Sequence, residues 1–395
     1  MDELQFLHDN LEDIHDKKQN KGEWSELYVF LKLLGEGALF TADNSLHKNP
    51  NCYLDILNII RQEFTDIIMT YNVNKDTCLI TIKANDTILK DVPMTNFLDT
   101  ANELLEGLSV KGASISAPQK VCDFAKIIYV SKPKAPAVKS LDKEFGGKND
   151  IYIETRDSQT AIVTRMGFSI KSQYSEPATL FNASTSSQIL YKVANCDDIK
   201  MNEFNNIKSY SASGKESRGW ELCVNYLNTH NMDLIFDKVK NDKLESNLYI
   251  IRNDMNKILA AYVKERLFTG YKDNHNLLEI TQKIIKTNPV GVYKPDIIYE
   301  KSIKDFLVAS FTGMTASSDW NGVEQVSGGY IVVMDNGDVL CYHSVDREGF
   351  RNYLYNNTHF EYVGTNKFKW SYIEKVHGEY YLPLNFSIRF NKKIR

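Results

Sequence analysis

The stretch Asn149–Gln173, "NDIYIETRDSQTAIVTRMGFSIKSQ", contains two runs of alternating apolar and polar residues on either side of the polar segment "TRDSQT". Alternation with a period of two, interrupted by turn residues, predicts an antiparallel β-hairpin. The first strand opens on an acid, Asp150, and the second closes on a base, Lys171. Ser169 lies two residues before that lysine and is expected on the same face of the strand.

An acid and a lysine on neighbouring strands suit phosphodiester hydrolysis with a divalent cation. Carboxylates hold the cation, and a lysine orients the attacking water and offsets phosphate charge. Such hairpins usually have a second acid at the position of Ser169. A longer loop would pair Asp150 with Ser169, whereas a tight turn at "DSQ" would place Asp150 opposite Arg165 or Met166. An ordinary exposed hairpin with polar ends remains the alternative.

The segment "GEWSELYVFLKLL" after Lys21 predicts a helix in which Glu23 and Glu26 share one face with Phe30 and Leu33. A carboxylate that continues an apolar stripe needs a partner, because burying it unpaired is costly. Glu26 is therefore a candidate for the carboxylate that the hairpin lacks. Acids in a first turn also stabilise a helix through its dipole, which is the alternative explanation.

The composition excludes several classes of protein. The chain has 395 residues, 43% hydrophobic and 25% charged, which is typical of globular proteins and compatible with two or three domains. No run approaches the roughly 18 apolar residues of a membrane span, and the acidic start lacks signal-peptide features, so we expect a cytoplasmic protein. The six cysteines lack metal-ligand spacing, which argues against zinc. A net charge of −4 argues mildly against a nonspecific nucleic-acid binder.

The hydrophobic periodicity predicts a mixed α/β (α+β) chain in which helices, strands, helices and strands follow one another. The expected hairpins are residues 77–94 and residues 328–343, the latter turning at Asn336-Gly337. The expected helices are residues 53–68 and 95–108, a helix that starts at Pro177, and most of residues 215–287. A strand is expected at residues 305–314.

Several long stretches resemble the HpaII-like type II restriction endonucleases. They run from about residue 21 to 390 and are "KGEWSELYVFLKLL", "MGFSIKSQ" followed by "PATLFNAS", "GGYIVVMDNGDVLCYHSVDREGFRNYLYNNT" and "LNFSIRF". The resemblance implies a PD-(D/E)xK restriction-endonuclease-like core, a central mixed sheet flanked by helices. It also implies a Mg²⁺-dependent endonuclease that cuts double-stranded DNA at a specific sequence and leaves 5′-phosphates. The family's namesake cuts the palindrome CCGG, which is the expected site.

The resemblance also implies which residues act. Asp150 matches the first acid of the motif and Lys171 its lysine, whereas Ser169 stands in place of the second acid. Mg²⁺ is expected to be held by Asp150, Glu26 and the backbone carbonyl of Ile170. Lys171 is expected to contact the attacking water, and Ser169 to hydrogen-bond a water in the site.

The source of the second carboxylate stays open, with Glu23 and Glu176 as weaker candidates than Glu26. In some restriction enzymes that recognise CCGG-containing sites and have Ser or Thr at this position, a substitute acid follows the lysine by about a dozen residues, but "LFNASTSSQ" contains no acid here. The same region is rich in hydrogen-bonding side chains. Gln173, Asn182 and Ser184 are therefore candidates for DNA contact.

The implied organisation is a polar N-terminal segment (1–20), a nuclease core (21–200) that contains the hairpin 149–173, and a helical plus β region (201–395). The last region is expected to serve DNA recognition or dimerisation. A palindromic site favours a homodimer on DNA, because symmetric half-sites match symmetric subunits. The resemblance also implies a bacterial cytoplasmic protein with a DNA methyltransferase as genetic companion. The competing interpretations are a structure-specific repair nuclease or resolvase with the same core, and a catalytically inactive DNA-binding relative.

Overall fold

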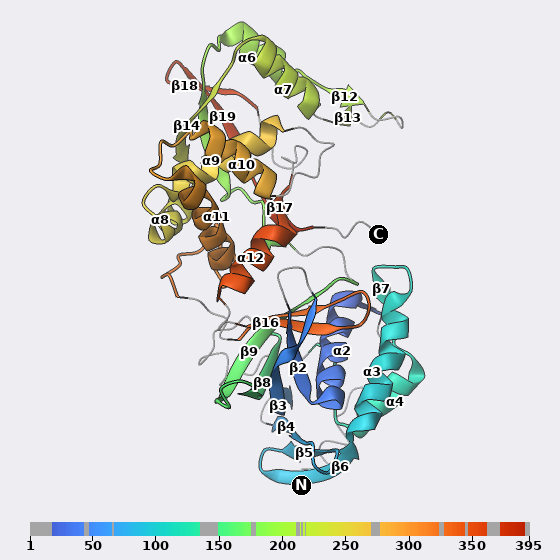
Figure 1. The fold of residues 1–395 in the computed structure, drawn as a ribbon. Coiled ribbons are helices and arrows are strands. Elements are labelled where there is room, and N and C mark those ends of the chain that lie inside the picture. The colour runs from blue at the N-terminus through green and yellow to red at the C-terminus, as the bar shows by residue number, and fades with distance from the viewer. Residues whose placement is uncertain are drawn as a thin grey trace. The chain divides into compact units, whose positions relative to one another are not determined.

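The chain divides into two compact units in a computed structural model. Unit 1 comprises residues 1–176 and 325–350, and unit 2 comprises residues 177–324 and 351–395. Both contain helices and sheets, which confirms the predicted mixed α+β class (Figure 1). The structure describes residues 18–42, 47–64, 67–134, 149–174, 179–210, 214, 216–217, 219–269, 277–323, 328–343, 347–361 and 372–391. Within these ranges, no helix has the length and apolar character needed to span a membrane.

The division differs from the predicted boundaries at residues 200 and 201. The chain after residue 177 already pairs with C-terminal strands of unit 2, while residues 329–343 return to the sheet of unit 1. Most of the predicted segment 1–20 lies outside the described residues. Unit 1 is therefore built from two separate stretches of sequence.

A nine-stranded mixed sheet forms the centre of unit 1. Its order is β2-β16-β15-β9-β8-β3-β4-β5-β6, and the pairs β9–β15 and β2–β16 are parallel. The strands are β2 (Ala38–Ala42), β3 (Lys48–Phe64), β4 (Ile67–Asn74), β5 (Leu79–Ala84), β6 (Thr87–Pro93), β8 (Ile151–Asp157), β9 (Val163–Ser172), β15 (Gly329–Val333) and β16 (Val339–His343). The hairpins β5–β6, β8–β9 and β15–β16 confirm the predictions from alternation and turn residues.

Three helices cover this sheet. They are α2 (Lys21–Glu36), α3 (Met94–Ser109) and α4 (Gln119–Ile127); α2 contacts the sheet, α3 packs on α2, and α4 on α3 (Figure 1). The side chain of Asn20 caps α2 by accepting from the Glu23 N–H (3.0 Å), and the helix ends at Gly37, whose φ of 65° suits glycine. A short ribbon, β1 (Gln19–Asn20) with β7 (Ser114–Ile115), lies beside α2.

The predicted helix at residues 53–68 is wrong. Residues 53–64 belong to β3, which pairs with β4 on one side and with β8 on the other. Leu54 and Ile56 are almost fully buried two residues apart, as a strand requires. The repeated isoleucines, which are β-branched, also favour a strand over a helix.

Unit 2 combines three small sheets with seven helices among the residues that the structure describes. The sheets are β14-β11-β19-β18, β10-β20-β17 and β12-β13. Their strands are β10 (Thr179–Phe181), β11 (Gln188–Val193), β12 (Ser209–Tyr210), β13 (Glu216–Ser217), β14 (Leu234–Val239), β17 (Thr358–Phe360), β18 (Glu374–Val376), β19 (Glu379–Asn385) and β20 (Ile388–Phe390). The helices are α6 (Asp198–Asn205), α7 (Trp220–Thr229), α8 (Asp242–Ile251), α9 (Met255–Phe268), α10 (Leu277–Thr287), α11 (Pro295–Phe311) and α12 (Arg347–Asn357), and the chain passes into unit 2 within α12.

Two further predictions fail in unit 2. Residues 305–311, expected as a strand, form the end of α11, which begins at Pro295, a residue suited to a first helical turn. Residues 179–193, expected as a helix starting at Pro177, form β10 and β11 instead; Pro177 itself lies outside the described residues. Residues 305–311 are a short apolar run, which periodicity alone does not assign to a helix or a strand. In residues 179–193, the mostly polar stretch "NASTSS" separates two short strands.

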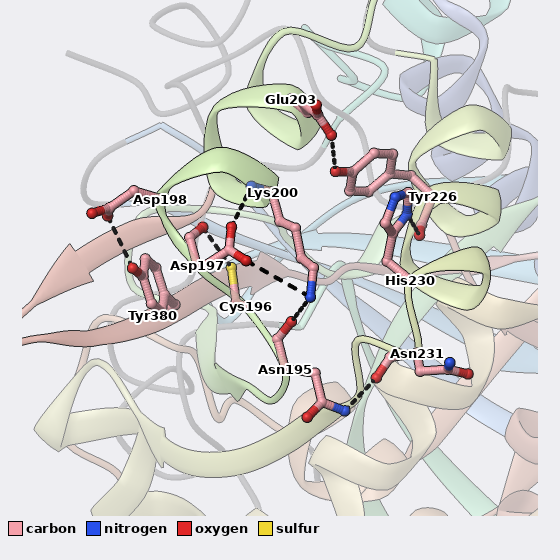
Figure 2. A network of polar contacts seen from close by, with 10 residues as sticks. All are labelled: Asn195, Cys196, Asp197, Asp198, Lys200, Glu203, Tyr226, His230, Asn231 and Tyr380. Atoms are coloured by element: carbon pink, nitrogen blue, oxygen red, sulfur yellow. Dashed lines mark hydrogen bonds and ion pairs between the residues drawn. The ribbon is translucent and has the colours of Figure 1, made fainter.

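A polar network ties α6 and α7 to their surroundings in unit 2 (Figure 2). The Asp197 carboxylate caps α6 (2.8 Å), and the hydroxyl of Tyr380 on β19 donates to Asp198 (2.9 Å). The Asn195 side chain donates to the carbonyl of Asn231 (2.8 Å), just before β14. These contacts join secondary structure elements, so the network is explained by the fold of unit 2.

Candidate active site

The register of the β8–β9 hairpin places Asp150 beside Ser169. Ile151 pairs with Phe168, and the Asp150 N–H donates to the Phe168 carbonyl (2.8 Å). The carboxylate of Asp150 accepts from the Ser169 hydroxyl (3.0 Å) and from the backbone N–H of Ile170 (2.8 Å). The longer loop, and not the tight turn at "DSQ", therefore sets this hairpin.

Ser169 contacts the carboxylate of Asp150. Its hydroxyl donates to Asp150 and so holds that carboxylate in one orientation. Gly167, which pairs with Tyr152, leaves room for the side chain of Asn149, the residue before Asp150. A Cβ at position 167 would overlap that side chain. The segment that carries Asp150 is thus fixed at both its backbone and its side chain.

Lys171 follows on the same face of β9 as Ser169, since the two are two residues apart. It pairs with Val332 of β15, and its ammonium lies 6.0 Å from the ring centroid of Tyr330. The side chain is partly exposed. Ile170 between them is buried in the hydrophobic core that also contains residues of α2.

Glu26 of α2 joins this group through a residue that the sequence did not indicate, Lys134. The Lys134 ammonium lies 3.7 Å from Oε1 of Glu26 and 4.0 Å from Oδ1 of Asp150. The side chains of Glu26 and Asp150 are only 12% and 18% exposed, whereas that of Lys134 is 57% exposed. The structure therefore brings the two predicted carboxylates to one place.

The second oxygen of Glu26, Oε2, is buried and has no hydrogen-bond partner among the described residues. Burial, and after it the charge of Asp150, raises the pKa of Glu26 from 4.5 to about 8, against the opposing charges of Lys134 and Arg61. A carboxyl group in this state is costly unless a cation or a donor reaches it. Glu26 thus fits a role as a cation ligand.

The oxygen atoms present suit a hard divalent cation such as Mg²⁺, which prefers carboxylate and carbonyl ligands. Glu26 and Asp150 supply the carboxylates, and the Ile170 carbonyl is the third predicted ligand. The described residues contain no group of three or more His, Cys, Asp or Glu side chains suited to a metal. Oxygens of the backbone, water or substrate can complete the shell of such a cation. Mg²⁺ commonly keeps such a mixed shell.

Neither of the two weaker candidates for the second carboxylate, Glu23 and Glu176, has a described contact with Asp150. Glu23 lies in the first turn of α2, where its N–H is bonded by the cap, and its charge contributes to raising the pKa of Glu26. This matches the helix-start explanation for Glu23. Glu176 lies outside the described residues.

The three candidates for DNA contact are divided between the units. Gln173 belongs to unit 1, where its side-chain oxygen accepts from the Asp335 N–H (3.2 Å) at the β15–β16 turn. Asn182 and Ser184 belong to unit 2. Asn182 is exposed, and Ser184 is held in a turn by the side chain of Asn385, which donates to its carbonyl (2.8 Å).

Comparisons with known proteins identify the family of this chain. The model of the HpaII restriction endonuclease family matches residues 20–390. The type II restriction enzyme HpaII of Haemophilus parainfluenzae is 31% identical over 391 residues, which cover 94% of this chain and 98% of that protein. No solved structure matches the chain. The matches confirm the predicted family and, with it, the predicted enzyme class of site-specific deoxyribonucleases: this chain belongs to the HpaII restriction endonuclease family.

Proposed function

We propose that this protein is a Mg²⁺-dependent type II restriction endonuclease with a PD-(D/E)xK-type core, which cuts double-stranded DNA at CCGG and leaves 5′-phosphates. The observation that carries the proposal is the convergence of Glu26 and Asp150 beside the strand that bears Lys171. The 31% identity to the enzyme HpaII supports the family. CCGG is proposed because it is the site of the family's namesake.

In the proposed site Asp150, Glu26 and the carbonyl of Ile170 would hold Mg²⁺. When bound, Mg²⁺ neutralises phosphate charge and makes water a better nucleophile at neutral pH. Ser169 and the Ile170 N–H orient the Asp150 carboxylate, each through a hydrogen bond. The buried Oε2 of Glu26 has no hydrogen-bond partner among the described residues and could bind the cation.

Lys171 orients the attacking water and offsets the charge that develops on the phosphate. The water oxygen forms a bond to phosphorus while the bond from phosphorus to the 3′-oxygen breaks in line. The water proton passes to solvent, and the 3′-oxygen takes up a proton as it leaves. The products are a 3′-hydroxyl and a 5′-phosphate.

Recognition of a G·C site in the major groove requires protein groups that donate hydrogen bonds to guanine and groups that accept a hydrogen bond from cytosine N4. We assign this readout to polar residues that follow the catalytic strand, with Gln173, Asn182 and Ser184 as candidates. A palindromic target fits a homodimer with one active site for each strand. We further propose a bacterial cytoplasmic setting, in which a cognate methyltransferase protects host DNA.

Cleavage of unmethylated plasmid DNA with mapped CCGG sites tests the proposal. The wild-type protein should give Mg²⁺-dependent fragments that end at those sites. Lys171→Ala should lower the cleavage rate by roughly 10²- to 10⁴-fold, because the water loses its orienting cation, while binding to DNA is largely kept. Lys120→Ala, which removes an exposed lysine of unit 1, is the matched control and should cut normally.

Three other results would change the proposal. Discrete fragments at other sites would keep the restriction endonuclease and discard CCGG. Cleavage of branched but not linear DNA would indicate a structure-specific nuclease. No cleavage by the wild-type protein, beside an active control enzyme, would indicate a catalytically inactive relative that lost the acid at the position of Ser169.

A further inference from the structure

Lys134 is the one described cation that lies within ion-pair distance of both proposed metal ligands. Its ammonium is 3.7 Å from Glu26 and 4.0 Å from Asp150. Both distances are long for a charge-assisted hydrogen bond, and the side chain is 57% exposed. The lysine is therefore loosely held, on a flexible four-carbon stem that allows it to move.

The backbone before Lys134 is, in contrast, firmly anchored. The carboxylate of Glu63 accepts from the N–H (3.0 Å) and the hydroxyl (2.7 Å) of Ser131. Arg61, paired with Glu63 at 2.6 Å, donates to the carbonyl of Lys132 (2.8 Å). Since the side chains of Arg61 and Glu63 are 3% and 0% exposed, this is a buried clamp on β3 that fixes where the stem of Lys134 begins.

A divalent cation held by Glu26 and Asp150 would lie against the same two carboxyl groups that Lys134 now faces. Two cations do not share one pair of carboxylates without strong repulsion. Lys134 must then leave the carboxylates when the divalent cation enters. The nearest new partner for a mobile ammonium group at a nuclease site is a phosphate oxygen of the bound DNA.

We propose that Lys134 is a displaceable counter-cation: it lies against the carboxyl groups of Glu26 and Asp150 until a divalent cation replaces it, and then moves to a DNA phosphate. The proposal deepens the proposed function and rests on it, because it takes Glu26 and Asp150 as the metal ligands. Lys134 is a positioning residue in the first state and a phosphate contact in the second. The clamp from β3 keeps its stem within reach of both.

Binding of Mn²⁺ to the DNA-free protein, followed by electron paramagnetic resonance, tests the first half. Lys134→Met keeps the apolar stem and removes the charge. It should bind Mn²⁺ about 5- to 10-fold more tightly than wild type, since a competing cation is gone. The titration is run above the pKa of about 8 of Glu26, so that protons compete little. Lys134→Arg should bind Mn²⁺ like wild type, and so should Lys120→Met, which removes an exposed lysine paired with Glu103.

Binding of a CCGG duplex in Ca²⁺ across a range of salt concentrations tests the second half. Lys134→Met should lower the slope of log affinity against log salt by about one counterion, whereas Lys120→Met should not. Mn²⁺ affinity that is unchanged or weaker in Lys134→Met overturns the displacement, and an unchanged salt slope overturns the phosphate contact. If the wild-type protein neither binds Mn²⁺ nor cuts DNA, the proposed function fails. If it does both and Lys134→Met behaves like wild type, only this inference fails.

Discussion

Glu26, the proposed metal ligand, lowers the stability of the protein that carries it. Its carboxyl is 12% exposed, one oxygen has no described partner, and its pKa is raised to about 8. The folded protein therefore keeps a proton on Glu26 at pH values where the unfolded chain has lost it. By linkage, the free energy of unfolding falls as pH rises from about 4.5 to about 8 and changes no further above that.

Glu26→Gln removes this titration, so the variant should not lose stability between pH 4.5 and pH 8 as the wild type does. Near pH 4.5 and below, the variant and the wild type should unfold at nearly the same temperature. Above pH 8 the variant should be more stable by about 1–3 kcal/mol, because the glutamine carries no buried charge. Thermal unfolding in EDTA checks this, and a stability difference that does not change with pH would contradict it. The same variant should lose Mn²⁺ binding, which separates its function from its stability.

At the scale of single elements, β3 both completes the sheet and places the chain beyond α4. Its buried pair Arg61–Glu63 holds Ser131 and Lys132 by three hydrogen bonds. A buried ion pair gains little overall against well-packed apolar residues, but breaking one is costly because a charge is left unpaired. The pair is therefore best understood as a device that fixes the geometry of the segment leading to Lys134.

Glu63→Gln should lower the free energy of unfolding by about 2–4 kcal/mol, because Arg61 keeps its buried charge and loses its counter-ion. The double variant Arg61→Met/Glu63→Gln should be less destabilised than the sum of the single variants, which a double-mutant cycle by chemical denaturation measures. The exposed pair Lys120–Glu103 is the control, and Glu103→Gln should cost less than about 1 kcal/mol. Equal costs for the buried and the exposed pair would refute the role of burial.

The elements that the sequence predicted correctly are those in which the hydrophobic pattern and the turn residues indicate the same structure. Alternation with polar turn residues predicted the β8–β9 and β15–β16 hairpins, and the latter turns at Gly337, whose φ is 86°. The failed segments at residues 53–68 and 305–314 lack a clear turn signal within them. In β3, isoleucines satisfy a helical and an alternating pattern equally well, and only pairing with β4 and β8 selects the strand.

The candidate site was predictable to the same extent. Asp150, Ser169 and Lys171 are local to one hairpin, so only the register was open, and Glu26 was suggested by an acid on an apolar helical face. Lys134 was not predictable, because it lies in a Lys/Pro-rich segment without periodicity. Its place depends on the clamp of Arg61 and Glu63, and the pairing of that clamp with Ser131 is a tertiary contact.

At the scale of the whole molecule, unit 1 depends on a hairpin that follows most of unit 2 in sequence. Strands β15 and β16 lie between β9 and β2, and Tyr330, Ile331 and Val333 of β15 are fully buried. Without this hairpin, β9 would present an unpaired edge along Phe168 to Ser172, next to an open core. The pairing of β9, the strand that carries Ser169 and Lys171, is therefore incomplete until the chain has been made through residue 343.

A fragment that ends at residue 176 should therefore fail to unfold cooperatively, because exposed strand edges and missing core residues leave a partly packed and aggregation-prone sheet. A fusion of residues 1–176 to residues 325–350 through a flexible linker should restore one cooperative transition in circular dichroism. The linker has to lead from the end of β9 back to the start of β15, since the two strands are parallel. Because Glu26, Asp150 and Lys134 all lie in unit 1, the fusion should bind Mn²⁺ with the affinity of the full chain. A cooperative transition of the shorter fragment at the same temperature as the fusion would show that β15 and β16 are dispensable, and the sheet order would then not describe the folding unit.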